Sequence, residues 1–175
     1  TAERAELSLT AGLIHTRLGD YDNALDQCTS ALNLAERLNE ATTLARAYNL
    51  WGHITRLMGQ SGIAIGYFQQ ALNLYQQIGD IRGQALAHNQ VAIACLYTGR
   101  LQEAERQGRL AREIFNQIGD MYNLLFVNNN LGEVLLKQGN LDGALVSYQE
   151  GLYTLEQIGG SAYVLGALHN NLGAT

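Results

Sequence analysis

The sequence predicts an all-α protein, an α-solenoid superhelix of antiparallel helix pairs with about nine helices. Glycine recurs about every twenty residues between apolar segments, small residues recur at fixed places within those segments, and the 175 residues include no proline. A long chain without proline is typical of successive helices, because proline breaks a helix interior. A β-sandwich would need turn residues about every ten positions, and a doubly wound α/β fold would need β-branched runs. The sequence shows neither pattern.

Two series of turn residues repeat with a spacing of 40. The first series contains Leu18-Gly19-Asp20, Met58-Gly59-Gln60, Thr98-Gly99-Arg100 and Gln138-Gly139-Asn140. The second lies midway and contains Leu38-Asn39-Glu40, Ile78-Gly79-Asp80, Ile118-Gly119-Asp120 and Ile158-Gly159-Gly160. A single glycine after an apolar-periodic segment is typical of a helix that ends in a left-handed residue. Asparagine is the residue that best replaces glycine at positive φ.

These turns predict helices near residues 2–18, 21–38, 41–58, 61–78, 81–98, 101–118, 121–138, 141–158 and 161–174. The helices form repeats near 1–40, 41–80, 81–120 and 121–160, followed by the first helix of a fifth repeat in 161–175. Leu172-Gly173 matches Leu131-Gly132 at a spacing of 41, which indicates one inserted residue near Gly160. The chain begins without methionine and its pattern stops abruptly. We therefore expect one repeat array over 1–175, cut from a longer protein.

Small residues mark the expected contacts between helices. On the second helix of each pair they are Ala24, Ala64, Ala104 and Ala144, then Ala31, Ala71, Ala111 and Gly151. On the first helix they are Gly12, Gly52, Ala92 and Gly132. Glycine inside a helix costs up to about 1 kcal/mol relative to alanine. We expect close helix packing at these positions to offset that cost.

The segment Tyr48-x-x-Trp51-Gly52, followed by Ala64-x-x-x-Phe68-x-x-Ala71, resembles the tetratricopeptide repeat. The resemblance covers essentially the whole chain and implies a right-handed superhelix. The period of 40 instead of 34 and the missing closing proline depart from the usual repeat, and Cys28 and Gly108 replace the second-helix aromatic. Forty-residue repeats are similar to those of Leu-Gly-Asn-repeat polarity adaptors. They are also similar to sensor arrays of bacterial signal-transduction ATPases and transcription activators.

Charge and motifs argue against several functional classes. The chain has 16 acidic and 11 basic residues, and Lys137 is its only lysine. We therefore expect no direct binding to nucleic acid through its phosphates. The sequence has no phosphate-binding loop, no nucleophile elbow and no paired catalytic carboxylates. The histidines lack partners at metal-ligand spacing. We expect a protein that is not an enzyme and has no catalytic residues, no metal and no cofactor.

The cysteines and the hydropathy pattern bear on location. Cys28 and Cys95 are too few and too far apart for a disulfide framework, and their repeat positions predict inert core thiols. A reducing cytoplasm is the simplest interpretation. No apolar run approaches the length of a membrane span, and no signal peptide is visible, so no membrane partner is expected.

The family resemblance implies a concave wall built by the first helix of each pair. Groove-facing positions in tetratricopeptide repeats lie three before, two before and one after the Leu-Gly glycine. The first position holds Asn49, Asn89, Asn129 and Asn170. The second holds Leu50, Gln90, Asn130 and Asn171, and the third holds His53, Ile93, Glu133 and Ala174. Arg46 and Arg56 lie about one turn away, with Arg17 and Lys137 at comparable places.

The column of four asparagines has two interpretations that the sequence leaves open. Asparagine is a mediocre helix former, so its repetition calls for an explanation. In the first interpretation the carboxamides bond the main chain of an extended peptide, and Arg46, Arg56, His53 and Glu133 provide specificity. In the second, each asparagine bonds the adjacent repeat and ties the solenoid together.

Three functions remain as hypotheses. The leading one is a scaffold that binds a protein or peptide in the concave groove. The arginines of its N-terminal half favour a partner with an acidic segment, although a solvated face explains them equally well. The alternative is the sensor or regulatory segment of a multidomain signalling ATPase or transcription regulator, which would bind an effector or clamp a neighbouring domain. The third is self-association through the final helix, whose apolar face includes Leu165, Leu168 and Leu172.

Overall fold

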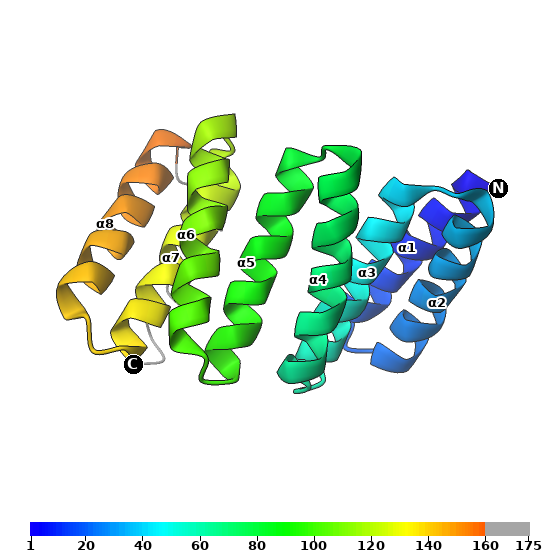
Figure 1. Cartoon of the computed structure of the whole chain (residues 1–175), viewed down its shortest axis with the longest axis horizontal. Coiled ribbons are helices and arrows are strands. Elements are labelled where there is room, and N and C mark those ends of the chain that lie inside the picture. The colour runs from blue at the N-terminus through cyan, green and yellow to red at the C-terminus, as the bar shows by residue number, and fades with distance from the viewer. Residues whose placement is uncertain (160–175) are drawn as a thin grey trace.

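The computed structural model describes residues 1–159, which form eight helices stacked as antiparallel pairs (Figure 1). They are α1 (Ala2–Arg17), α2 (Tyr21–Leu38), α3 (Ala41–Leu57), α4 (Ser61–Ile78), α5 (Ile81–Tyr97), α6 (Leu101–Ile118), α7 (Met121–Lys137) and α8 (Leu141–Gln157). Each helix packs on the next one along the chain. Contacts between neighbours in sequence are what defines a solenoid, so this part of the fold prediction is confirmed.

The expected helix bounds agree with these eight helices to within one residue at each end. The expected ninth helix, 161–174, lies outside the described residues. Asn170, Asn171 and the apolar residues expected to mediate self-association lie there as well. Those expectations therefore stay predictions.

The predicted left-handed residues are present at every helix end in the described part of the chain. Gly19, Gly59, Gly79, Gly99, Gly119, Gly139 and Gly159 have φ between 70° and 80°. Asn39 has a φ of 56°, as its place in the glycine series predicted. The reversed backbone lets the next amide bond a carbonyl of the last helical turn, for example Asp20 N–H to the His15 carbonyl at 3.0 Å. Each forty-residue repeat therefore contains two turns at which the chain reverses direction.

Four of the left-handed glycines are directly followed by a residue whose side chain caps the N-terminus of the next helix. Asp20, Asp80, Asp120 and Asn140 accept the backbone N–H of the third following residue, at 2.8–3.4 Å. Such caps satisfy an amide that has no partner inside the helix. One short turn thus ends one helix and starts another, which keeps the helices antiparallel and closely spaced.

Two glycines on first helices face an aromatic side chain on the second helix of the same pair. A Cβ on Gly52 would lie 2.6 Å from the Phe68 ring, and one on Gly132 would lie 2.5 Å from the Tyr148 ring. In the third repeat both facing positions are small, because Ala92 on the first helix stands opposite Gly108 on the second. A Cβ on Gly108 would lie 3.9 Å from the Ala92 Cβ and 3.3 Å from Leu131 of α7. The helices of these three pairs therefore approach closely at a glycine, although the residue opposite the glycine differs from pair to pair.

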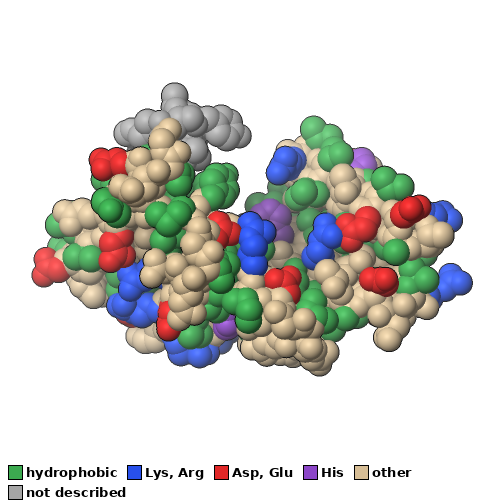
Figure 2. Space-filling view, turned by 90° about the horizontal axis from the view of Figure 1, so that it is seen from above, with side chains coloured by type: hydrophobic (Ala, Val, Ile, Leu, Met, Phe, Trp, Pro, Cys, Tyr) green, Lys and Arg blue, Asp and Glu red, His purple; other side chains and the backbone are tan. Residues whose placement is uncertain are grey.

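The odd-numbered helices form the inner wall of the stack. α1 contacts α3, α3 contacts α5 and α5 contacts α7, whereas consecutive even-numbered helices are farther apart. A stack that is tight along one wall and spread along the other curves toward the tight wall. Figure 2 shows that the molecule is hollowed between its two ends.

We expect Gly52→Ala to lower the free energy of unfolding by about 1–3 kcal/mol, because the added methyl group would overlap the Phe68 ring. Gly66→Ala is the matched control, since a Cβ there meets no atom within 4 Å. Replacing this glycine, which is exposed to solvent in the middle of α4, with alanine should raise the free energy of unfolding by about 0.5–1 kcal/mol. Urea denaturation followed by circular dichroism measures both. Equal effects of the two variants would contradict the packing described for Gly52.

Candidate functional site

A pocket of about 350 Å³ opens on the inner wall across α1, α3 and α5. Four of the polar groove residues expected from the sequence line it together: Arg46, Asn49, His53 and Gln90. Apolar side chains form much of the remaining lining, namely Leu9, Leu13, Leu50 and Leu86, with Thr10 and Tyr75. A mainly apolar pocket with a few convergent polar groups is the usual form of a binding site.

Two carboxamide oxygens in this pocket have no hydrogen-bond partner among the described residues. They are Asn49 Oδ1 on α3 and Gln90 Oε1 on α5, and both atoms are buried. Leaving a buried acceptor unsatisfied costs about 1–3 kcal/mol. The pocket therefore presents two acceptors, one from each of two adjacent repeats, that a donor group in the pocket could satisfy.

The same two repeat positions are occupied differently one repeat later. Asn89 on α5 and Asn130 on α7 correspond to Asn49 and Gln90, and here the Asn130 amide donates to Asn89 Oδ1 at 3.1 Å. This pair joins adjacent repeats by a side-chain to side-chain bond. The two interpretations of the asparagine column therefore each find a counterpart in the geometry, at different junctions.

The remaining expected groove residues lie outside the pocket. Asn129 is buried in α7, with 5% of its surface exposed. Glu133 is half-buried on the same helix and, after burial itself, is the second cause that raises the pKa of the Tyr148 hydroxyl. Four of the expected polar groove residues therefore lie in one pocket at the α3–α5 junction, whereas Asn129 and Glu133 lie on α7 outside it.

Arg46 is paired with a residue that the sequence analysis did not single out. Its Nη1 donates to both carboxylate oxygens of Glu6 at 2.6–2.7 Å, and the Thr43 hydroxyl donates to Glu6 Oε1 at 3.2 Å. Glu6 and Arg46 stand 40 residues apart and occupy the same repeat position. Opposite charges at one repeat position are visible in the sequence, so this ion pair could have been predicted.

His53 and Arg56 form a second polar pair on α3. The Arg56 guanidinium donates to His53 Nδ1 at 3.3 Å, and its central carbon lies 6.0 Å from the centre of the Tyr97 ring. Burial, followed by the charge of Arg56, lowers the pKa of His53 to about 4. Burial also lowers the pKa of Arg56. His53 is therefore neutral at physiological pH and lines the pocket without adding charge.

The thiols are buried as their repeat positions predicted. Cys28 Sγ donates to the Ala47 carbonyl at 3.1 Å, and burial raises the pKa of this thiol to about 12. Burial also raises the pKa of the Cys95 thiol. Within residues 1–159, no three His, Cys, Asp or Glu side chains lie close enough together to hold a metal ion. None of the described helices combines the length and apolar character needed to cross a membrane.

Family models described as tetratricopeptide repeat match this sequence over most of its length. One model matches residues 3–77 and 43–117, and a second matches residues 129–160. No curated protein matches the sequence.

Several solved structures are similar in fold. RapI in its apo form has a TM-score of 0.84 at 16% identity, with 98% of this chain and 69% of RapI covered. A Rap protein complexed with Competence and Sporulation Factor has a TM-score of 0.85 at 16% identity, with 99% and 54% covered. BtubC from P. vanneervenii has a TM-score of 0.79 at 18% identity, with 90% and 65% covered.

A fourth similar structure is much larger. It is a signal transduction ATPase with numerous domains from Pyrococcus horikoshii, which has a tetratricopeptide repeat sensor. Its TM-score is 0.80 at 17% identity, and the match covers 90% of this chain but 24% of the larger protein. This chain thus spans between about a quarter and two thirds of the length of these four proteins. At such identities the similarity shows the fold alone.

We expect His53 to make stability depend on pH between its ordinary pKa of 6.5 and its folded value of about 4. In that window the unfolded chain binds a proton that the folded chain does not, so the free energy of unfolding falls as the pH decreases. The loss reaches at most about 3 kcal/mol. His53→Gln should lack this part of the dependence while keeping an acceptor for Arg56. Urea denaturation of both proteins at about pH 7 and about pH 4.5 measures the difference. Identical pH dependence in the two proteins would contradict the burial of a neutral His53.

Proposed function

Because this chain belongs to the tetratricopeptide-repeat family, we propose that it is a scaffold, without catalytic activity, that binds an extended segment of a partner protein on its inner wall. The observation behind the proposal is the pair of buried, unpartnered oxygens of Asn49 and Gln90 in one pocket. Each residue of an extended polypeptide except proline offers one backbone N–H. Two such donors would satisfy the two oxygens.

The spacing of the wall suits an extended segment. Packed helices lie about 8–10 Å apart, and an extended chain advances about 3.3 Å per residue. Two or three residues of the partner therefore span the distance from one inner helix to the next. Contacts with the backbone fix the position of the segment without reading its sequence, so sequence preference must come from the rest of the pocket.

The pocket favours a partner segment with apolar side chains. Leu9, Leu13, Leu50 and Leu86 offer apolar surface, and His53 is neutral. The Arg46 charge is matched by Glu6, so an acidic partner residue has to compete with an existing ion pair. We therefore place the acidic preference expected from the sequence second to the apolar one.

A second candidate function is the sensor segment of a larger signalling protein. The fold similarity to the repeat sensor of the Pyrococcus horikoshii ATPase and to the Rap protein complexed with Competence and Sporulation Factor supports it. In that case the same pocket would hold a short effector, and the change in curvature on binding would act on a neighbouring domain. The length of polypeptide that the pocket accepts distinguishes the two candidates.

We expect the double variant Asn49→Ala with Gln90→Ala to bind peptides at least about tenfold more weakly than the unchanged chain, because two buried acceptors are lost. The probe is the tightest peptide selected from a phage library of random segments roughly twelve residues long, which span about 40 Å when extended. Isothermal titration gives the Kd. The matched control is Asn33→Ala with Asn73→Ala, which removes exposed carboxamides from α2 and α4 and should leave the Kd unchanged.

A selected peptide that binds both double variants equally well would refute the inner-wall assignment, as would a library that yields no binding peptide. Trimming the peptide one residue at a time separates the two candidate functions. Affinity that persists down to a few residues favours the sensor, whereas affinity that needs most of the segment favours the scaffold.

Gln90→Asn offers a test that does not depend on lost stability. It reproduces at the α3–α5 junction the pair of residue types that bond each other in Asn89 and Asn130. We expect the new inter-repeat hydrogen bond to raise the free energy of unfolding by about 0.5–1.5 kcal/mol and to weaken peptide binding, because the acceptor of Asn49 becomes occupied. Urea denaturation and titration with the selected peptide measure the two effects. A variant that gains stability and binds the peptide unchanged would show that these oxygens do not contact the ligand.

A further inference from the structure

A second and larger hollow, of about 790 Å³, lies on the outer wall between α6 and α8, with residues of α7 at its base. None of its lining residues lines the pocket on the inner wall. Its volume falls within the range of about 300–1,000 Å³ that is usual for small-molecule sites. What it could bind follows from how its residues differ from those at the same positions in the other repeats.

The hollow places polar residues at positions that are apolar elsewhere in the array. Arg112 stands where the first two repeats have Leu32 and Leu72, both buried core residues at 8% exposure. Thr154, which is buried, stands where the earlier repeats have Leu34, Leu74 and Ile114. Two apolar positions of the repeat have therefore become polar at the same junction.

Asn128 supplies the clearest sign of a ligand. Its side chain lines the hollow with 2% of its surface exposed, and its Oδ1 has no hydrogen-bond partner among the described residues. The residue at the same position one repeat earlier, His88, is bonded to Gln107 on α6. A buried carboxamide oxygen without a partner costs about 1–3 kcal/mol, which a bound donor would recover.

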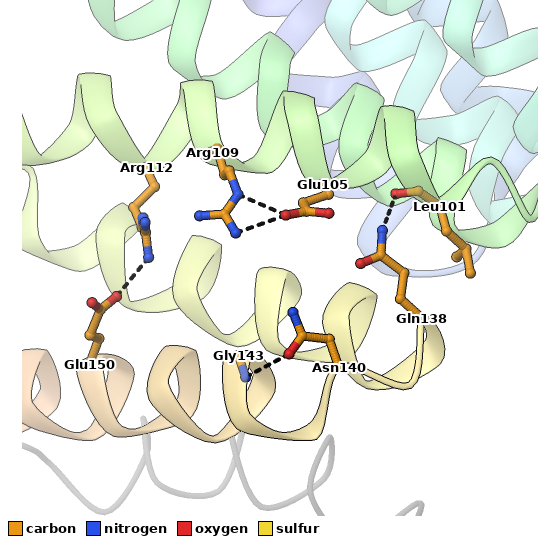
Figure 3. Close-up of polar contacts among 8 residues, drawn as sticks. All are labelled: Leu101, Glu105, Arg109, Arg112, Gln138, Asn140, Gly143 and Glu150. Carbon is orange, nitrogen blue, oxygen red and sulfur yellow. Dashed lines mark hydrogen bonds and ion pairs between the residues drawn. The ribbon is translucent and has the colours of Figure 1, made fainter.

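Charges of both signs meet at this hollow. Arg112 of α6 and Glu150 of α8 point toward each other across α7 and form an ion pair of 2.8 Å (Figure 3). The two side chains are 29% and 47% exposed. A ligand that carries both charges can replace both partners of this pair at once, which a singly charged group cannot do. Arg109 lies beside them and is held by Glu105. The site therefore offers a cation, an anion and a neutral acceptor together.

We propose that this outer-wall hollow binds a small zwitterion of the α-amino acid class. The carboxylate of the ligand forms an ion pair with the Arg112 guanidinium. The ammonium group of the ligand donates hydrogen bonds to Glu150 and to Asn128 Oδ1. An ammonium group has three donors and no acceptor, which suits a carboxylate and a carboxamide oxygen. Met121, Leu124 and Tyr153 line the hollow and would contact an apolar side chain of the ligand.

The test uses the twenty standard L-amino acids and a set of dipeptides as probes. Thermal unfolding of the whole chain identifies the probe that raises Tm most, and isothermal titration gives its Kd. Arg112→Leu restores the residue type of the first two repeats, and Asn128→Leu removes the buried oxygen. We expect both variants to fold with an undiminished Tm and to bind the probe at least about tenfold more weakly.

Two controls make the result specific. Arg106→Leu removes an exposed arginine from the same helix, where it pairs with Glu103, and should leave the Kd unchanged. The double variant of Asn49 and Gln90 should also bind the probe normally, which separates this site from the one on the inner wall. N-acetylated and C-amidated forms of the probe should each bind at least about tenfold more weakly, because each lacks one of the two charges.

The proposal is overturned if no probe binds at concentrations up to about 10 mM. It is also overturned if Arg112→Leu or Asn128→Leu binds the probe as the unchanged chain does. Equal binding of the acetylated or amidated probe would exclude a zwitterion as the ligand.

Discussion

A left-handed residue after each helix is the constraint on which the rest of this structure depends. Seven glycines and Asn39 reverse the chain about every twenty residues, and the reversal leaves room for one short turn between helices. Because all helices are then similar in length, residues about 40 positions apart come to lie side by side on neighbouring repeats. The ion pair of Glu6 with Arg46 and the hydrogen bond of Asn130 to Asn89 both join residues at such separations.

The bounds of the eight described helices could be predicted because a glycine, or Asn39, follows each helix at a regular spacing in the sequence. The repeat position brings four of the expected polar groove residues into one pocket, whereas Asn129, at the same repeat position as Asn49, is buried outside it. What the sequence could not reveal is which carboxamides bond each other. Asn89 and Asn130 pair, whereas Asn49 and Gln90 occupy the same positions with one additional methylene group and do not. The Glu6–Arg46 pair and the polar residue at Arg112 were both visible as departures from the repeat. Interpreting them required knowing which helices face each other.

The repeats also show how a common geometry tolerates different residues. Phe68 and Tyr148 each pack against a glycine of the preceding helix, while Gly108 stands opposite Ala92. In each of these pairs one of the two facing residues is glycine, so the helices stay close together while the residue opposite changes. Polar substitutions need not disturb this spacing when they lie between repeats instead of within a pair. Both hollows occupy such junctions, one on each wall, so a ligand site can differ from repeat to repeat without a change of fold.

Every substantial contact between helices joins elements that are one or two places apart along the chain. During folding, no segment of residues 1–159 has to find a partner from the far end of the molecule, so little loop-closure entropy opposes assembly. Folding can nucleate at any pair of helices and propagate to the neighbouring pairs in both directions. Because each repeat is held mainly by its neighbours, a ligand that bridges two adjacent repeats would slow their separation during unfolding.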